Sequence, residues 1–153
     1  MTTDAQKRTE AVTYLLNGTL TSIQNVIPMN LNIQKPNDLK QDPIIKFGVL
    51  IGITGDIKGK LILSAQSSVF SSIGESMYGM KLEGEMLTSF SGELGNMIAG
   101  GISTINDSND LETNITAPTI MEGNTTIKGY EKAIQLNVEV EDKGEIEVYL
   151  LLD

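Results

Sequence analysis

The sequence predicts an α+β fold, in which a long first helix is followed by a β-hairpin, two consecutive helices and further antiparallel strands. Three observations predict this order. Apolar residues recur at helical spacing near the N-terminus, two β-rich runs flank a turn that contains glycine, and the C-terminal part returns to β-rich runs. The length of 153 residues suits one domain with a real hydrophobic core, so residues 1–153 are expected to form a single domain.

The first helix is expected over residues 9–26. Apolar residues from Val12 to Ile27 fall on one stripe at about 100° per residue, and Pro28 then ends the helix. Residues 35–43 are polar and bounded by prolines, which predicts a loop.

The hairpin is expected from strands at residues 47–53 and 60–64, because the segment between them has glycines where a turn needs positive φ. A helix that begins at Ser67 or Ser68 should end at Gly79. The next helix is expected from about residue 85 to at least residue 99. The glycine pair that follows favours fraying or a break in this helix.

The remaining strands are expected at residues 113–116, 133–140 and 145–152. The last one ends in three leucines and is apolar on both faces. Such a strand is either central and buried or paired across a dimer interface, and the pattern alone leaves both open.

Composition excludes several classes of function. Eleven basic residues against 20 acidic ones give a formal charge of −9, which disfavours nucleic acid and anionic membranes as partners. The chain has no cysteine and no histidine, so it lacks a thiolate nucleophile, the usual general base and the commonest transition-metal ligand. The carboxylates between residues 139 and 147 alternate along strands, which is typical of a solvated sheet face, and no metal site is predicted. Without a signal-like or membrane-spanning apolar run, the protein is expected in the cytoplasm.

Glu93 and Asn96 carry the clearest chemical signal. Residues three apart on a helix lie on one face with β-carbons roughly 5–6 Å apart, so a carboxylate and a carboxamide would point at one target. A carboxylate can bind a cation, and a carboxamide can both donate to and accept from a water molecule. The flanking stripe has no large apolar and no basic residue, and it is expected to be exposed and to meet a partner through Glu85, Ser89, Gly92 and Gly100. The side that this stripe flanks should face the core through Met86, Leu87, Phe90, Leu94, Met97 and Ile98.

Residues 92–101, Gly-Glu-Leu-Gly-Asn-Met-Ile-Ala-Gly-Gly, resemble the signature helix of the CheX branch of the CheC/CheX/FliY chemotaxis phosphatases. Residues 48–59 are similar to the hairpin of that family, residues 117–123 to its proline-containing strand segment, and residues 141–148 to its closing hairpin. The resemblance covers nearly the whole chain in the right order.

The resemblance implies an enzyme that removes the phosphoryl group from the aspartate of a phosphorylated CheY-type response regulator. Asn96 would orient the attacking water, and Glu93 would pair with the active-site lysine of the regulator. No cofactor is expected on this chain, since Mg²⁺ would be held by the regulator. The CheX branch also implies a homodimer formed by edge-to-edge strand pairing. The first helix lacks a second Glu-x-x-Asn motif, which separates the chain from CheC-type relatives.

An alternative function stays open at this point: a non-catalytic module that binds phosphorylated receiver domains or joins a flagellar-switch assembly. The intact Glu93 and Asn96 pair favours the enzyme, because binding alone does not require the carboxamide.

Overall fold

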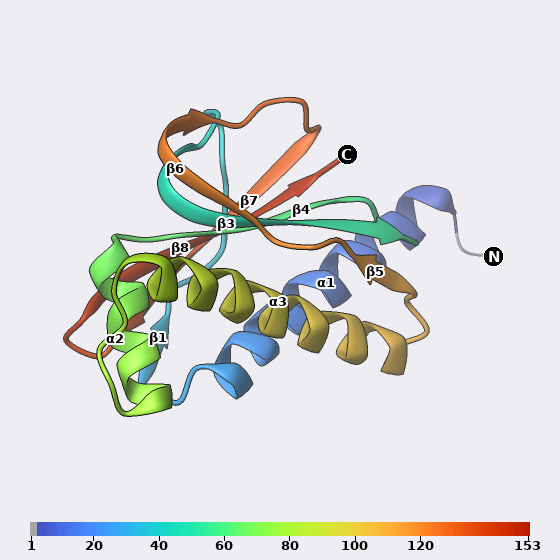
Figure 1. Ribbon diagram of the computed structural model, residues 1–153. Coiled ribbons are helices and arrows are strands. Elements are labelled where there is room, and N and C mark those ends of the chain that lie inside the picture. Colours follow the sequence, from blue (N-terminus) through green and yellow to red (C-terminus); the bar gives the residue numbers. More distant parts are fainter. Residues whose placement is uncertain (1–2) are drawn as a thin grey trace.

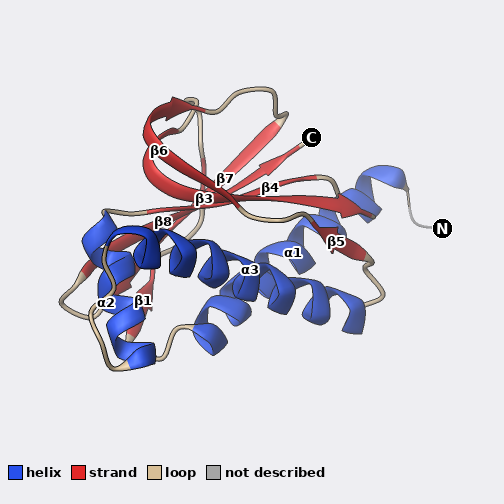
Figure 2. Ribbon diagram, viewed as in Figure 1, coloured by secondary structure: helices blue, strands red, loops and turns tan. Residues whose placement is uncertain are grey.

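A computed structural model describes residues 3–153 of the chain (Figure 1). Three helices lie together on one side of an eight-stranded sheet (Figure 2). In chain order the elements are α1 (Asp4–Val26), β1 (Leu31–Ile33), β2 (Asn37–Asp38), β3 (Ile44–Gly55), β4 (Gly59–Ser64), α2 (Ser67–Tyr78), α3 (Gly84–Ser108), β5 (Thr113–Ile115), β6 (Thr119–Thr126), β7 (Lys132–Val140) and β8 (Gly144–Leu152).

All pairings in the sheet are antiparallel, in the order β1-β7-β8-β4-β3-β5, with β2 paired to β7 and β6 paired to β3. The α+β fold that the sequence predicts is therefore confirmed. Strand β8 lies between β7 and β4, and its last three leucines are all buried. Of the two alternatives for this strand, the buried central position is the one found.

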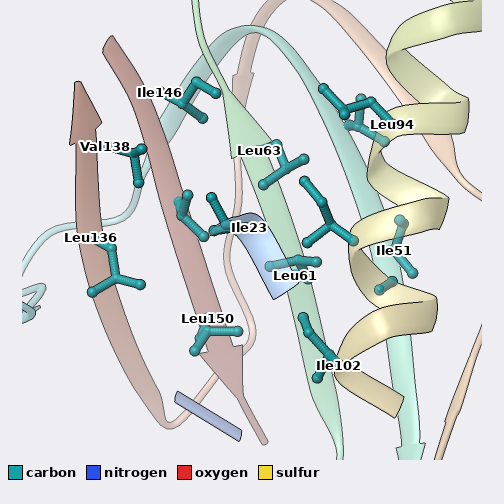
Figure 3. Packing of buried hydrophobic residues seen from close by; sticks show 14 of the residues in the cluster. Ile23, Ile51, Leu61, Leu63, Leu94, Ile102, Leu136, Val138, Ile146 and Leu150 are labelled. Atoms are coloured by element: carbon teal, nitrogen blue, oxygen red, sulfur yellow. The ribbon is translucent and has the colours of Figure 1, made fainter. Parts of the chain in front are cut away.

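Two hydrophobic clusters stabilise the sheet, one on each face. The larger cluster lies between the sheet and the helices, where Leu94 and Ile102 of α3 meet Ile51 of β3 and Leu61 of β4 (Figure 3). The smaller one occupies the other face and includes Ile62, Tyr149 and Leu151. Because both faces of β4 and β8 are buried, the alternation of polar and apolar residues is lost there.

Helix α1 begins at Asp4, five residues before the expected start. Thr3 and Gln6 form a capping box, in which each side chain bonds the backbone N–H of the other. Because the cap lies ahead of the first apolar residue, the helix begins earlier than the apolar stripe predicts.

Strands β1 and β2 were missed, and residues 37–38 lie within the segment expected to be a loop. These strands have three and two residues, too few for periodicity to be measured, and they exist through their pairing with β7. Within residues 3–153, no helix combines the length and the apolar character needed to cross a membrane.

Helix α3 continues past Gly100 and Gly101 to Ser108, so the expected fraying or break is wrong. A β-carbon on Gly101 would collide with the Ser22 side chain of α1, and the Ser22 hydroxyl donates a hydrogen bond to the carbonyl of Ile98 at 2.7 Å. The glycine therefore allows α1 and α3 to approach closely. The stability gained from this packing compensates for the low helix propensity of glycine.

Candidate active site

Helix α3 is held on three sides by contacts made where its residues are small. Gly95 lies against β3, where an added β-carbon would be 2.8 Å from Val49. Gly92 faces Pro118 and Ile120 at the start of β6, and Gly101 faces α1. Leu94 and Ile98 fill the space between these contacts and are buried. The helix is therefore fixed in position while one side stays uncovered.

Glu93 and Asn96 lie on that uncovered side, and both are exposed. Within residues 3–153, neither side chain has a hydrogen bond or an ion pair. Their spacing on a regular helix places the β-carbons roughly 5–6 Å apart. The structure thus brings a free carboxylate and a free carboxamide together on a rigid ridge, as the sequence predicts.

The other four predicted contact residues do not share one environment. Glu85 and Ser89 are exposed on the ridge, and Gly100 has open space where a side chain would be. Gly92 is buried, so its predicted exposure is wrong. Its position on the helix brings it against Pro118 and Ile120, which lets α3 approach β6 rather than a partner.

Met86 and Met97, which the sequence assigned to the core, are 54% and 39% exposed. At 100° per residue, they are displaced from Glu93 around the helix by only about 20° and 40°. The angle of each methionine from Glu93, rather than its apolar character, would have predicted that both are exposed. They add apolar surface directly beside the acidic and amide groups.

Exposed apolar residues also continue from the ridge toward the end of α2. Tyr78 and Met80 are both more than half exposed. Together with Met86 and Glu93 they help to line a cavity of about 580 Å³ between the end of α2 and the start of α3. This surface was not predicted from the sequence.

The charge on the ridge is negative. Glu85 lies in the first turn of α3, where a carboxylate also interacts favourably with the helix dipole. Glu93 adds a second carboxylate, and no basic residue lines the cavity beside them. No group of three or more potential metal-ligating side chains occurs within residues 3–153. The two carboxylates therefore make the ridge attractive to a positively charged group.

Residues 47–140, more than half of the chain, match the family described as "Chemotaxis phosphatase CheX". The chain belongs to the CheX family of chemotaxis phosphatases. The match includes all of α3 and therefore the Glu93 and Asn96 ridge. The phosphatase class that the sequence predicts is confirmed at this level.

Relatives support the same assignment to the CheX family. The chain is 29% identical over 144 residues to "CheY-P phosphatase CheX" of Thermotoga maritima, covering 91% of this chain and 93% of the relative. A CheX crystal structure from Desulfovibrio desulfuricans has a TM-score of 0.79 at 17% identity, with 94% and 99% coverage. A complex titled CheX-CheY-BeF3-Mg+2 from Borrelia burgdorferi has a TM-score of 0.75 at 20% identity, with 92% and 96% coverage. At these identities the two solved structures show a shared fold.

Proposed function

We propose that this CheX-family chain hydrolyses the aspartyl phosphate of a phosphorylated CheY-type response regulator. In this proposal Asn96 orients the attacking water, and Glu93 pairs with the active-site lysine of the regulator. The observation that carries the proposal is the free Glu93 and Asn96 pair, held on a fixed and uncovered helix face. The Thermotoga relative, described as a CheY-P phosphatase, supports the choice of substrate.

The reaction needs no nucleophile from this chain. Water attacks phosphorus as the bond from phosphorus to the aspartyl oxygen breaks, and the products are inorganic phosphate and the free carboxylate. The acyl phosphate is already activated, which suits a chain that has neither histidine nor cysteine. The carboxamide of Asn96 accepts one hydrogen bond from the water and can donate another, which aligns it for in-line attack.

Mg²⁺ is expected on the regulator rather than on this chain. The Borrelia complex joins CheX and CheY with Mg²⁺ and BeF3, and BeF3 is a chemical analogue of a phosphoryl group. The described residues here hold no cluster of metal ligands. The chain would then supply orientation and docking, while the partner supplies the metal ion that neutralises charge on the phosphoryl oxygens.

Rigid positioning is the physical basis of the rate gain. Correct orientation of a reactant can lower a barrier by several kcal/mol, and a displacement of about 1 Å can cost roughly 100-fold in rate. Helix α3 is fixed by close packing against β3, β6 and α1. The backbone position from which each side chain on its exposed face extends is therefore also fixed.

Loss of phosphate from a radiolabelled CheY-type regulator in Mg²⁺ tests the proposal. The wild type should accelerate the decay, and Asn96→Ala should lose the acceleration by roughly 100-fold or more. The variant should still bind a regulator activated with beryllium fluoride. Equal acceleration by Asn96→Ala and the wild type would refute the mechanism. Binding without any acceleration by the wild type would favour a non-catalytic module.

A further inference from the structure

We propose that the cavity beside Glu93 is a docking groove for an apolar side chain of the phosphorylated regulator, presented next to a basic group. The inference rests on the proposed function and deepens it by naming a second contact that would select the substrate. The groove is formed by the end of α2, the loop that follows it and the first turns of α3. It is lined by Tyr78, Met80, Leu82, Glu85, Met86, Ser89, Phe90 and Glu93.

The walls of the groove are apolar and accessible. Tyr78, Met80 and Met86 are each between 51% and 54% exposed, although they lie close to one another around one concave surface. Few large apolar residues elsewhere in residues 3–153 are so exposed. Clustered apolar exposure of this kind marks interaction sites more often than scattered exposed residues do. Methionine adapts its shape readily, which suits a surface that must accommodate a partner side chain.

Tyr78, Leu82 and Phe90, which line part of the groove, are held by internal contacts. The ring of Tyr78 packs edge to face on Phe90, with centroids 5.7 Å apart and planes at 87°. The hydroxyl of Ser71 donates a hydrogen bond to the carbonyl of Leu82 at 3.0 Å. Gly74 leaves the space that the Leu82 side chain fills. This part of the groove is therefore in place before binding, which reduces the entropy lost on binding.

The groove is continuous with the proposed active ridge, because Ser89 and Glu93 belong to both. Glu85 and Glu93 are eight residues apart on α3, about 12 Å along the helix axis. A regulator whose lysine reaches Glu93 therefore lies within about 12 Å of the first turn of α3. An apolar side chain there would enter the groove in the same docking event.

Charge favours the regulator over a second copy of this chain. Two carboxylates and no basic residue line the groove, and the neighbouring Lys81 is paired with Glu83. A second copy would bring a formal charge of −9 toward these carboxylates, whereas a basic group beside an apolar side chain would complement them. The lysine proposed to pair with Glu93 is such a group.

The test compares Met80→Gln/Met86→Gln with wild type and with Met80→Leu/Met86→Leu. Glutamine keeps the approximate length of methionine but is polar, and leucine keeps an apolar surface. The dissociation constant for a CheY-type regulator activated with beryllium fluoride is measured, together with the rate of phospho-regulator decay. We expect the glutamine variant to bind about 10-fold more weakly and to lose kcat/KM in proportion, with the rate at saturation changed little. The leucine variant should retain most of the affinity.

Ile44→Gln is the matched control, because Ile44 is 60% exposed on β3 and does not line the groove. It should leave the dissociation constant unchanged. Unchanged affinity in the glutamine variant, or equal losses in the glutamine and control variants, would overturn the inference. So would a wild type that does not bind the regulator, or a glutamine variant that only alters self-association. Because affinity is measured without turnover, binding that is groove-dependent but not hydrolytic would refute the proposed function alone.

Discussion

At the scale of single residues, Glu93 and Asn96 are neighbours on one helix face with separable roles. If Glu93 acts by charge on a lysine of the regulator, Glu93→Gln should weaken binding of the activated regulator about 10-fold at low salt. Its affinity should also depend less on salt than that of the wild type, because an ion pair is screened and a neutral pair is not. Titrations at low and high NaCl measure both effects.

Asn96→Ala is the matched control for this prediction, since it removes a neutral side chain from the same exposed face. Its affinity should keep the salt dependence of the wild type. If Glu93→Gln and Asn96→Ala have the same salt dependence, the proposed charge pairing at Glu93 is incorrect.

The sequence predicts the exposure of Glu93 and Asn96 correctly but not the limits of the exposed stripe. Gly92, Met86 and Met97 all lie at its borders, where the outcome depends on which other segment covers the helix. β6 reaches Gly92, and no described segment covers Met86 or Met97 to the same degree. Helical spacing gives the angle of a side chain, but the covering segment is tertiary information.

At the scale of elements, the adjacent glycines of α3 should respond in opposite directions. Gly100→Ala has open space and should raise the free energy of unfolding by about 0.5–1 kcal/mol, because alanine favours helix. Gly101→Ala would collide with Ser22 of α1 and should lower it by about 1–3 kcal/mol. Urea unfolding of both variants measures the difference. Equal effects would contradict the close approach of α1 and α3.

Gly100→Ala also tests the role predicted for Gly100 in partner contact. A stable variant that binds the activated regulator more weakly would support a close approach of the partner at this position. Unchanged affinity would leave Gly100 without a role in docking.

Most elements follow from local patterns, but β1 and β2 do not, and β6 is expected only through the resemblance of residues 117–123 to a strand segment of the family. The hairpin of β3 and β4, the C-terminal end of α2 and the pair β7 and β8 are all predicted, because each has a turn or cap with a glycine in left-handed backbone. Gly79, for example, has φ of 72° at the end of α2. β1 and β2 depend on pairing with a strand about one hundred residues away, which local spacing does not report.

At the scale of the whole molecule, the sequence predicts the α+β fold and, through the resemblance, the family. It does not place β8, because an all-apolar strand suits a central position and an interface equally well. The homodimer and the extent of a single domain over residues 1–153 stay predictions.

Global stability should fall at alkaline pH through Tyr149, which lies on the sheet face opposite the helices. Its burial, and its hydrogen bond to the carboxylate of Glu147, raise the pKa of this phenol well above 10. In the unfolded chain the pKa is about 10. Below that pH the phenol is protonated in both states and has no effect. As the pH rises above it, the unfolded state releases the proton first, so the free energy of unfolding decreases until the native phenol also ionises.

Tyr149→Phe removes this titration and keeps the ring in the cluster. The free energy of unfolding should therefore fall less steeply for the variant than for the wild type between about pH 10 and pH 11. The partly buried Tyr130, whose pKa is also raised by its hydrogen bond to Asp42, is present in both proteins, so the difference between the two profiles isolates Tyr149. Urea unfolding at pH 8, 10 and 11 measures the profiles. If the free energy of unfolding fell equally with pH in both proteins, the Tyr149 phenol would not be held protonated in the native state. The smaller hydrophobic cluster would then admit solvent near Tyr149.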